Sequence, residues 1–268
     1  MRIVWQPIID MRDEHVLGYE ALARFDDGRS PDVVFAEAWQ RGCGLELERE
    51  AVRLALSEAD QLVGGLDLYV SVNVSPQTLC EGVEALVSAS SLHRDQIAIE
   101  ITEHAQIDAL ALYKALAPFR DSKGLIALDD VGTGYSGLWH ISQVDPHLLK
   151  LDRFIVAGID TDPAKRAIAR AITALARDMR ATVIAEGVER EEERDWLLAI
   201  GLTVGQGHLF CSPAPVADHL ELLELQEVVH PRRILALHHL DARERGADLR
   251  KRAESLAAGR SGTGEGDA

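Results

Sequence analysis

Cysteines are few in this chain of 268 residues, and it contains no long apolar run. The three cysteines, Cys43, Cys80 and Cys211, are far apart and form no C-x-x-C pair, which argues against a disulfide framework and a structural zinc site. No apolar run reaches the ~18 residues that a membrane span requires. The first residues, MRIVWQPIID, lack the basic and apolar regions of a secretory signal. We therefore expect a soluble, cytoplasmic protein without membrane insertion.

Basic residues are also scarce, because 28 lysines and arginines stand against 44 aspartates and glutamates and give a net charge of −16. This balance argues against general affinity for DNA or RNA polymers, so any phosphate ligand must be met by a local arrangement of residues. Residues 231–268 hold 8 basic and 6 acidic side chains, which leaves residues 1–230 with a charge of −18. The negative charge of residues 1–230 has two explanations. The acidic side chains either lie on a solvated surface, or some of them form a cluster of carboxylates that binds cations.

Strand-like and helix-like segments alternate along most of the chain. The alternation predicts an α/β fold with a largely parallel sheet, either doubly wound or closed into a (β/α)8 TIM-like barrel. A barrel typically needs about 250 residues, so the length favours the barrel. Residues 2–10 and 16–25 flank the turn sequence MRDEH and predict a hairpin, hence one antiparallel strand near the N-terminus. Further strands are expected at 66–74, 96–102, 124–130, 147–152 and 181–188, and helices at 31–41, 45–63, 76–90, 107–121, 163–179 and 190–200.

The pattern changes near residue 231. The sequence predicts a barrel domain at 1–230, a charged helical extension at 231–257 and a disordered glycine-rich tail at 258–268. The extension could cap the barrel, form a helix for a partner, or be incidental.

Polar side chains stand at the end of nearly every predicted strand, where parallel β/α proteins collect their chemistry. Five carboxylates and one amide oxygen form an all-oxygen set that suits two Mg²⁺ or Mn²⁺ ions. Two such ions about 4 Å apart can clamp the oxygens of an in-line phosphoryl displacement and lower the pKa of a bridging water. The strand-end residues are Glu20, Asn73, Glu100, Glu103, Asp129, Asp130, Lys150, Asp152, Glu186 and Gln206, and the oxygen set is Glu20, Asn73, Glu100, Asp129, Asp130 and Glu186.

Each of these residues also has a simpler interpretation. A lone acid at a strand end is more often a helix cap or an ion-pair partner. A simpler role for Asn73 is to shape the turn before Ser75-Pro76. A simpler role for Lys150 is an ion pair with Asp152, two residues further on. Their joint occurrence on successive strands is what favours a metal site.

The segment DDVGTGYSG at 129–137 also contains G-x-G-x-x-G after an apolar strand, as a nicotinamide-binding fold would. Such a fingerprint holds pyrophosphate on backbone N–H groups, and two aspartates directly before the glycines would repel that anion. Neighbouring strand residues point to opposite faces. We therefore expect Asp129 and Asp130 to converge where the glycines let the chain leave the strand.

With these motifs in place, the chain resembles the EAL-domain phosphodiesterases, which hydrolyse cyclic di-GMP. The likeness extends over roughly residues 3–215. The resemblance implies a (β/α)8 barrel with one antiparallel strand and metal-dependent cleavage of cyclic di-GMP to linear pGpG. The matching motifs are QPI at 6–8, EAL at 20–22, NVS at 73–75, EITE at 100–103, DDVGTGYSG at 129–137, KLD at 150–152, AEGVE at 185–189 and QGHLF at 206–210.

The family pattern also implies roles for single residues. Glu20, Asn73, Glu100 and Asp129 would bind one metal ion, and Asp129, Asp130 and Glu186 the second. Lys150 would hold the attacking water, Asp152 would orient Lys150 or that water, and Glu186 would be the general base. The implied substrate contacts are Arg24, Leu22, Gln206 and Gln6, and the residues that couple the loop to dimer contacts are Glu103, Val131, Gly132, Thr133, Gly134 and Tyr135.

Three positions depart from the family pattern: Val131 replaces a phenylalanine, His208 an aromatic residue and Gly137 a serine. None is a metal ligand, so the departures bear on loop packing. The resemblance further implies a homodimer. Ca²⁺ should inhibit, because it takes longer bonds and a looser geometry than Mg²⁺. Regulation could come from a sensory or GGDEF diguanylate cyclase domain outside these residues, from a separate protein, or from self-association. The alternative is a catalytically weak EAL fold that serves as a cyclic di-GMP receptor or a protein-interaction module.

Overall fold

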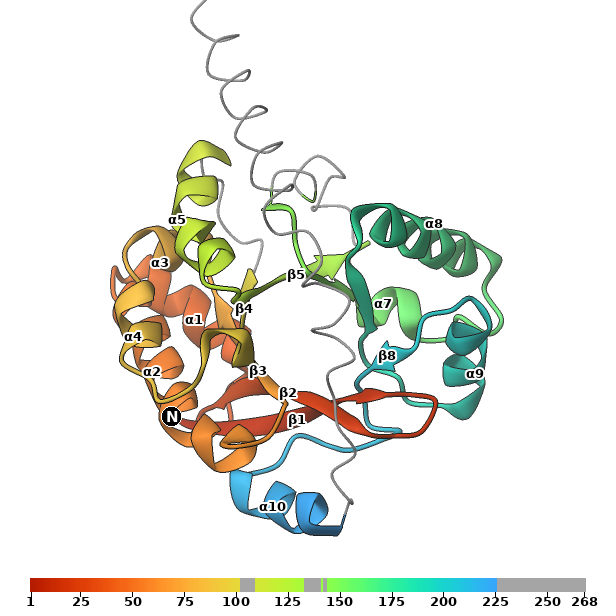
Figure 1. Ribbon diagram of the computed structural model, residues 1–268, viewed down its shortest axis with the longest axis horizontal. Coiled ribbons are helices and arrows are strands. Elements are labelled where there is room, and N and C mark those ends of the chain that lie inside the picture. The colour runs from red at the N-terminus through yellow and green to blue at the C-terminus, as the bar shows by residue number, and fades with distance from the viewer. Residues whose placement is uncertain (102–108, 133–140, 142–143, 226–268) are drawn as a thin grey trace, which may run out of the picture.

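Eight strands close into a barrel in the order of the sequence (Figure 1). The computed structural model describes residues 1–101, 109–132, 141 and 144–225. β1 pairs antiparallel with β2 and β8, and all other neighbours pair in parallel. The predicted barrel with one antiparallel strand near the N-terminus is therefore confirmed. The strands are β1 (Arg2–Asp10), β2 (Val16–Arg24), β3 (Tyr69–Val74), β4 (Ile97–Ile101), β5 (Leu125–Val131), β6 (Leu148–Leu151), β7 (Thr182–Ala185) and β8 (Val204–Gly205).

Helices cover the outside of the barrel. α2 packs on β1, β2 and β3, α5 packs on β5, and α8 packs on β6 and β7. α10 lies against β1 and α2, where the buried His219 ring bonds the Trp5 carbonyl. In the described part of the chain the helices are α1 (Pro31–Gln40), α2 (Gly44–Val63), α3 (Pro76–Cys80), α4 (Glu84–Ser88), α5 (Ala109–Asp121), α7 (Arg153–Val156), α8 (Pro163–Met179), α9 (Glu191–Ala199) and α10 (Val216–Leu225), with a 3-10 turn η1 (Arg94–Gln96).

The structure corrects two sequence predictions of helices and strands. The helix expected at 76–90 is divided into α3 and α4, because Gly82 between them adopts a left-handed φ of 108°. The elements β8, α7 and α10 were not predicted. β8 and α7 have only two and four residues and carry little periodicity, whereas α10 has ten residues. Side chains cap two of the helices: Ser75 Oγ accepts from Thr78 N at the start of α3, and Asp162 accepts from Ala164 N at the start of α8.

Inside the barrel, an apolar layer supports a polar one. Alternate residues of a strand point to the same face, so the polar residue two positions after an apolar interior residue lies above it. The pairs, each apolar residue followed by its polar partner, are Ala98 and Glu100, Ala127 and Asp129, Leu148 and Lys150, Ile184 and Glu186, and Val204 and Gln206.

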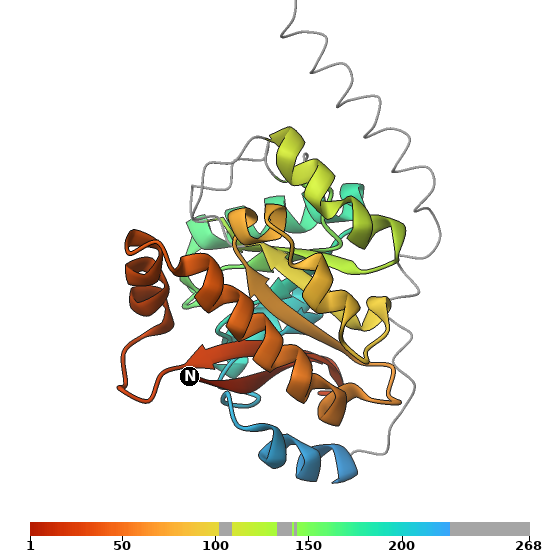
Figure 2. The same ribbon diagram turned by 90° about the vertical axis from the view of Figure 1, so that its left-hand side faces the viewer.

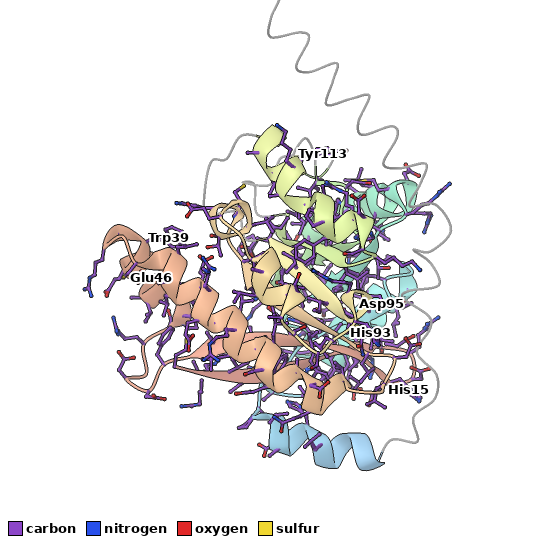
Figure 3. The ribbon with its side chains drawn as sticks, turned by 60° about the vertical axis from the view of Figure 1, so that its left-hand side comes forward. His15, Trp39, Glu46, His93, Asp95 and Tyr113 are labelled. Carbon is purple, nitrogen blue, oxygen red and sulfur yellow. The ribbon has the colours of Figure 1, made fainter. Side chains whose placement is uncertain are left out.

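The polar layer faces the end of the barrel at which the parallel strands finish. Figure 2 shows the barrel and its helices turned by 90° from the view of Figure 1. His15, in the β1–β2 turn, and His93, before β4, lie at the opposite end from Trp39, near the α1–α2 junction (Figure 3). Within the described residues, no helix is long and apolar enough to cross a bilayer.

Candidate functional site

The strand-end carboxylates converge on the ammonium group of Lys150 in β6, a side chain that is 2% exposed. Its Nζ atom lies 3.0 Å from Glu20 Oε1 and 2.6 Å from Glu186 Oε1. It also lies 3.5 Å from Asp129 Oδ1 and contacts Glu100 Oε1. Carboxylates from four different strand ends therefore surround one buried cation.

The carboxylates fall into two overlapping groups. In the first, Glu20, Glu100 and Glu186 each offer an oxygen within 4.8 Å of the others, and Asp129, Asp130 and Glu186 do the same in the second. Glu186 belongs to both groups. Together these five carboxylates outnumber the one lysine, and hard divalent cations neutralise such an excess of negative charge. This donor set fits the expected Mg²⁺ or Mn²⁺ pair.

A β-bulge brings the two neighbouring aspartates together. Between Leu128 and Val131, β5 has two residues, Asp129 and Asp130, opposite the single residue Lys150 of β6. Asp130 adopts a left-handed φ of 57°, which is uncommon for a residue other than glycine. The extra residue turns both carboxylates toward the same cluster. The expectation that the following glycines cause this convergence is therefore wrong, because it occurs within the strand.

Three neutral side chains hold the carboxylates in place. Ser71 Oγ donates to Glu100 Oε2 at 2.7 Å, and Asn73 Nδ2 donates to Glu20 Oε1 at 3.1 Å. Gln206 Nε2 donates to Glu20 Oε2 at 2.5 Å, and it is 4% exposed. Because the Asn73 nitrogen faces Glu20, its carbonyl oxygen is the atom that could bind a cation. Ser71 was not predicted, although its position two residues before Asn73 places it on the same face of β3.

Burial and crowding shift the pKa values of the cluster. Burial raises the pKa of Glu100 and of Glu186 well above the ordinary value, and neighbouring carboxylates add to the effect. Burial and the charge of Asp129 raise the pKa of Asp130 to about 6. Burial alone would lower the pKa of Lys150, but the surrounding carboxylates raise it well above the ordinary value. Lys150 is therefore charged, and the site attracts further positive charge.

Asp152 occupies a different place from the one the sequence suggested. Its carboxylate caps α7 by accepting from Phe154 N at 2.7 Å, and it also interacts with Asp130. Among the described residues, the carboxylates within 4.0 Å of Lys150 Nζ belong to Glu20, Glu100, Asp129 and Glu186, and Asp152 is not one of them. The expected Lys150–Asp152 pair is therefore wrong, because β6 ends at Leu151 and the chain turns into α7.

A cleft of about 820 Å³ opens beside the cluster. Of the predicted substrate contacts, Leu22 and Arg24 line it, and Arg24 Nη1 donates to the Ala23 carbonyl. The other two, Gln6 and Gln206, are not among the lining residues. Gln6 is buried opposite Glu20 in the β1–β2 pair and donates to the Cys211 carbonyl at 3.2 Å. The further lining residues used below are Glu20, Asn73, Asp129, Asp130, Phe35 and Trp39.

The loop implicated in dimer coupling is described only at its start. Val131 packs in the hydrophobic core opposite Leu151, and Gly132 follows with a φ of 112°. Glu103, Thr133, Gly134 and Tyr135 lie outside the described residues, as do residues 226–268 with the predicted extension and tail.

Comparison with known proteins gives relatives across most of the chain. A model of the EAL domain family matches residues 1–213. Escherichia coli K12 PdeB, named a probable cyclic di-GMP phosphodiesterase, is 30% identical over 82% of this chain and 44% of PdeB. PdeR of the same organism, named a cyclic di-GMP phosphodiesterase, is 33% identical over 80% of this chain and 34% of PdeR. The chain thus spans less than half the length of either relative.

Solved structures agree with the sequence comparisons. The manganese and cyclic di-GMP complex of Klebsiella pneumoniae BlrP1 at pH 6 superimposes with a TM-score of 0.71 and 32% identity, covering 80% of this chain and 56% of that one. A PaMucR phosphodiesterase complex with cyclic di-GMP superimposes with a TM-score of 0.73 and 28% identity, covering 82% of this chain and 98% of that one. These likenesses and the family match show that the chain belongs to the EAL domain family.

Proposed function

We propose that this chain is a phosphodiesterase that uses two divalent cations to hydrolyse cyclic di-GMP to linear 5′-pGpG, and so lowers the level of this second messenger in bacterial signalling. The observation that carries the proposal is the convergence of five carboxylates and Lys150 beside the 820 Å³ cleft. The names of PdeB, PdeR and the BlrP1 complex support the substrate.

The oxygen ligands divide between two positions. Glu20, Asn73 and Glu100 would hold one cation, Asp130 and Glu186 would hold the other, and Asp129 would bridge them. When bound, the two Mg²⁺ or Mn²⁺ ions supply Lewis acidity toward the phosphoryl oxygens and lower the pKa of water.

Two residues of this chain would handle the attacking water. Lys150 Nζ donates a hydrogen bond that holds the water, and Glu186, 2.6 Å from Nζ, accepts the proton that the water loses. The water oxygen bonds to phosphorus while the bond from phosphorus to the 3′ oxygen breaks, which leaves a 5′ phosphate. Asp152 would act indirectly, through its cap on α7 and its contact with Asp130.

The cleft would bind the rest of the dinucleotide. The planar guanidinium of Arg24 suits bidentate contact with a phosphate. Leu22 lines the cleft with the apolar rings of Phe35 and Trp39. Contacts of Gln206 and Gln6 with the nucleotide remain predictions. In this structure the amide nitrogen of Gln206 donates to Glu20, and that of Gln6 donates to the Cys211 carbonyl.

The test is a product assay. Purified protein is incubated with cyclic di-GMP and Mg²⁺, Mn²⁺ or Ca²⁺, and the nucleotides are separated by chromatography. We expect pGpG with Mg²⁺ and Mn²⁺, and inhibition by Ca²⁺, which takes longer bonds and a looser geometry. Glu20→Ala should abolish turnover, while Glu46→Ala, an exposed glutamate of α2, should retain it.

Two results would overturn the proposal. Undiminished hydrolysis by Glu20→Ala would refute the ligand assignment. Tight binding of cyclic di-GMP by the wild-type protein without release of pGpG would favour the receptor function instead.

We also propose a homodimer through the loop that begins at Asp129, and regulation by a sensory or GGDEF domain. Sedimentation of the purified chain tests the first of these.

A further inference from the structure

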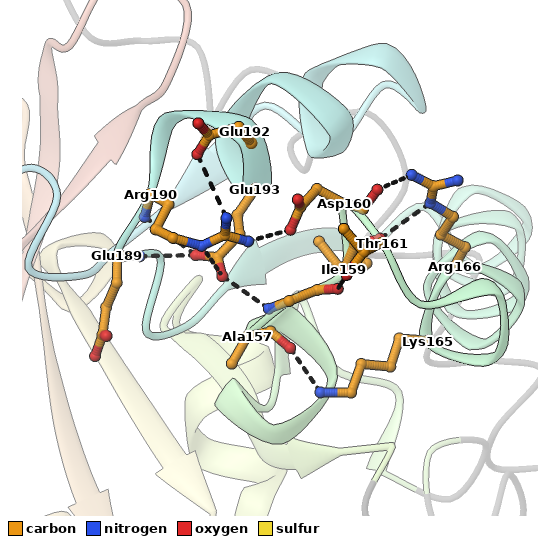
Figure 4. A network of polar contacts seen from close by, with 11 residues as sticks. Ala157, Ile159, Asp160, Thr161, Lys165, Arg166, Glu189, Arg190, Glu192 and Glu193 are labelled. Carbon is orange, nitrogen blue, oxygen red and sulfur yellow. Dashed lines mark hydrogen bonds and ion pairs between the residues drawn. The ribbon is translucent and has the colours of Figure 1, made fainter.

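A polar network outside the acidic cluster joins two loops that extend from the cluster (Figure 4). Residues 157–162 follow α7, in the segment that begins with Lys150. Residues 186–190 begin with Glu186 at the end of β7 and lead into α9. The carboxylate of Glu193, in the first turn of α9, lies between these loops and is 3% exposed.

Glu193 accepts hydrogen bonds from both loops. Its Oε1 atom accepts from Gly158 N at 2.7 Å, and its Oε2 atom accepts from Glu189 N and Arg190 N, both at 3.1 Å. Arg190 Nε also donates to Oε1 at 3.2 Å. Loss of this carboxylate would leave these backbone N–H groups without their acceptor, which destabilises the arrangement of both loops. Glu193 therefore fixes the spacing between the loops.

Further cationic side chains hold the 157–162 loop from two sides. Arg190 pairs with the Asp160 carboxylate from the α9 side. From α8, Lys165 Nζ donates to the Ala157 carbonyl at 2.6 Å, and Arg166 donates to the carbonyl of Ile159 at 3.0 Å and to that of Asp160. The loop is thus anchored to α8 and to α9.

The 186–190 loop is held equally closely. Glu186 N donates to the Leu151 carbonyl at 3.0 Å, which joins the loop to the end of β6. Gly187 has a φ of 62°, and a Cβ there would lie 2.5 Å from Arg153 Cγ, so the Arg153 stem lies directly against its backbone. Arg153 Nη2 then pairs with Glu189 Oε1 at 2.9 Å. A shift of this loop would move Glu186 away from Lys150.

We propose that Glu193, with Arg190 and Asp160, is a positioning clamp that keeps Glu186 in the group it forms with Asp129 and Asp130. The clamp residues lie between positions 160 and 193 and tie the 157–162 loop to the 186–190 loop. The ligands of the other cation position, Glu20, Asn73 and Glu100, lie on β2, β3 and β4. Glu186 also borders the first group but would bind only the second cation, so loss of the clamp should weaken the second cation position far more than the first. The inference rests on the proposed function.

The test counts Mn²⁺ ions by electron paramagnetic resonance during titration. Wild-type protein should bind two ions. Glu193→Ala should bind the first with unchanged affinity and the second about tenfold or more weakly, the range seen when groups supporting metal ligands are removed. Its kcat should fall by a similar factor, and its KM for cyclic di-GMP should change little. Glu191→Ala, in the same first turn of α9 and with an exposed side chain, is the matched control and should behave as the wild type.

A purely structural role would give a different pattern. Leu116→Ala, at a fully buried position of α5, should lower the melting temperature without affecting one ion selectively. If Glu193→Ala does not stay folded, Asp160→Asn, which keeps Glu193 but removes the charge that pairs with Arg190, should show the same selective loss to a smaller extent. Equal weakening of both ions, or no weakening, overturns the clamp while the wild-type protein stays active. A wild-type protein that binds fewer than two Mn²⁺ ions or releases no pGpG overturns the proposed function, and the clamp with it.

Discussion

Replacement of Lys150 by methionine tests the charge balance of the site most directly. Methionine keeps the length of the apolar stem and removes the ammonium that contacts four carboxylates. Removal of one partner from a buried ion pair typically costs 3–5 kcal/mol, because the remaining charge stays buried without compensation. The lower figure applies here, since Glu100, whose pKa burial raises, can take up a proton instead. About 3 kcal/mol corresponds to a loss of roughly 10 °C in melting temperature for a domain of this size.

Divalent cations should reverse much of this loss. They neutralise the same carboxylates, and in Lys150→Met they meet no competing ammonium. Ligand at one hundred times its Kd stabilises a protein by about 2.7 kcal/mol. Saturating Mn²⁺ should therefore raise the melting temperature of Lys150→Met more than that of the wild type. Turnover should stay low even so, because no Nζ atom holds the water.

The assay is thermal unfolding followed by circular dichroism, after dialysis against chelator and again with Mn²⁺. Lys114→Met, at an exposed position of α5, is the control and should melt with the wild type. If Lys150→Met melts within about 2 °C of the wild type in chelator, Lys150 does not compensate the carboxylates. If Mn²⁺ stabilises the two proteins equally, the cations do not take over its role.

Three further predictions follow from single contacts. Arg24→Lys should raise KM for cyclic di-GMP by about tenfold with a smaller change in kcat, since an ammonium cannot make the bidentate phosphate contact; an unchanged KM would remove Arg24 from the substrate site. Ser71→Ala should lower the free energy of unfolding in urea by about 1–3 kcal/mol, because Glu100 loses a buried donor; a neutral effect would contradict the 2.7 Å hydrogen bond. Burial opposes ionisation of Glu193, but hydrogen bonds from Gly158, Glu189 and Arg190 outweigh it and lower the pKa of Glu193 below its ordinary 4.5. Its ionised form therefore stabilises the fold above pH 4.5, and this contribution is lost as the pH falls through the lowered value. The stability difference between wild type and Glu193→Gln should accordingly shrink in urea titrations as the pH falls below 4.5, and a difference that is constant with pH would refute the assignment.

The sequence determined the fold class, the family and most members of the candidate site. Alternating strands and helices with polar strand ends are local patterns, and they predict a barrel whose chemistry lies where the strands finish. Glu20, Glu100 and Glu186 could be found in this way because each follows an apolar strand run and must reach the same end of a parallel barrel. Motif order then indicated the family, and through it the substrate class proposed above.

Contacts between distant segments were decided only in the tertiary structure. The bulge that sets Asp129 and Asp130 opposite Lys150 depends on the pairing of β5 with β6, which no local pattern specifies. Lys150 bonds carboxylates 130 and 50 residues away rather than Asp152 nearby, because closure of the barrel brings all the strand ends to one axis. Glu193 reads as an ordinary first-turn glutamate in the sequence. Its reach to Gly158, 35 residues earlier, exists only once α9 has packed beside the loop after α7.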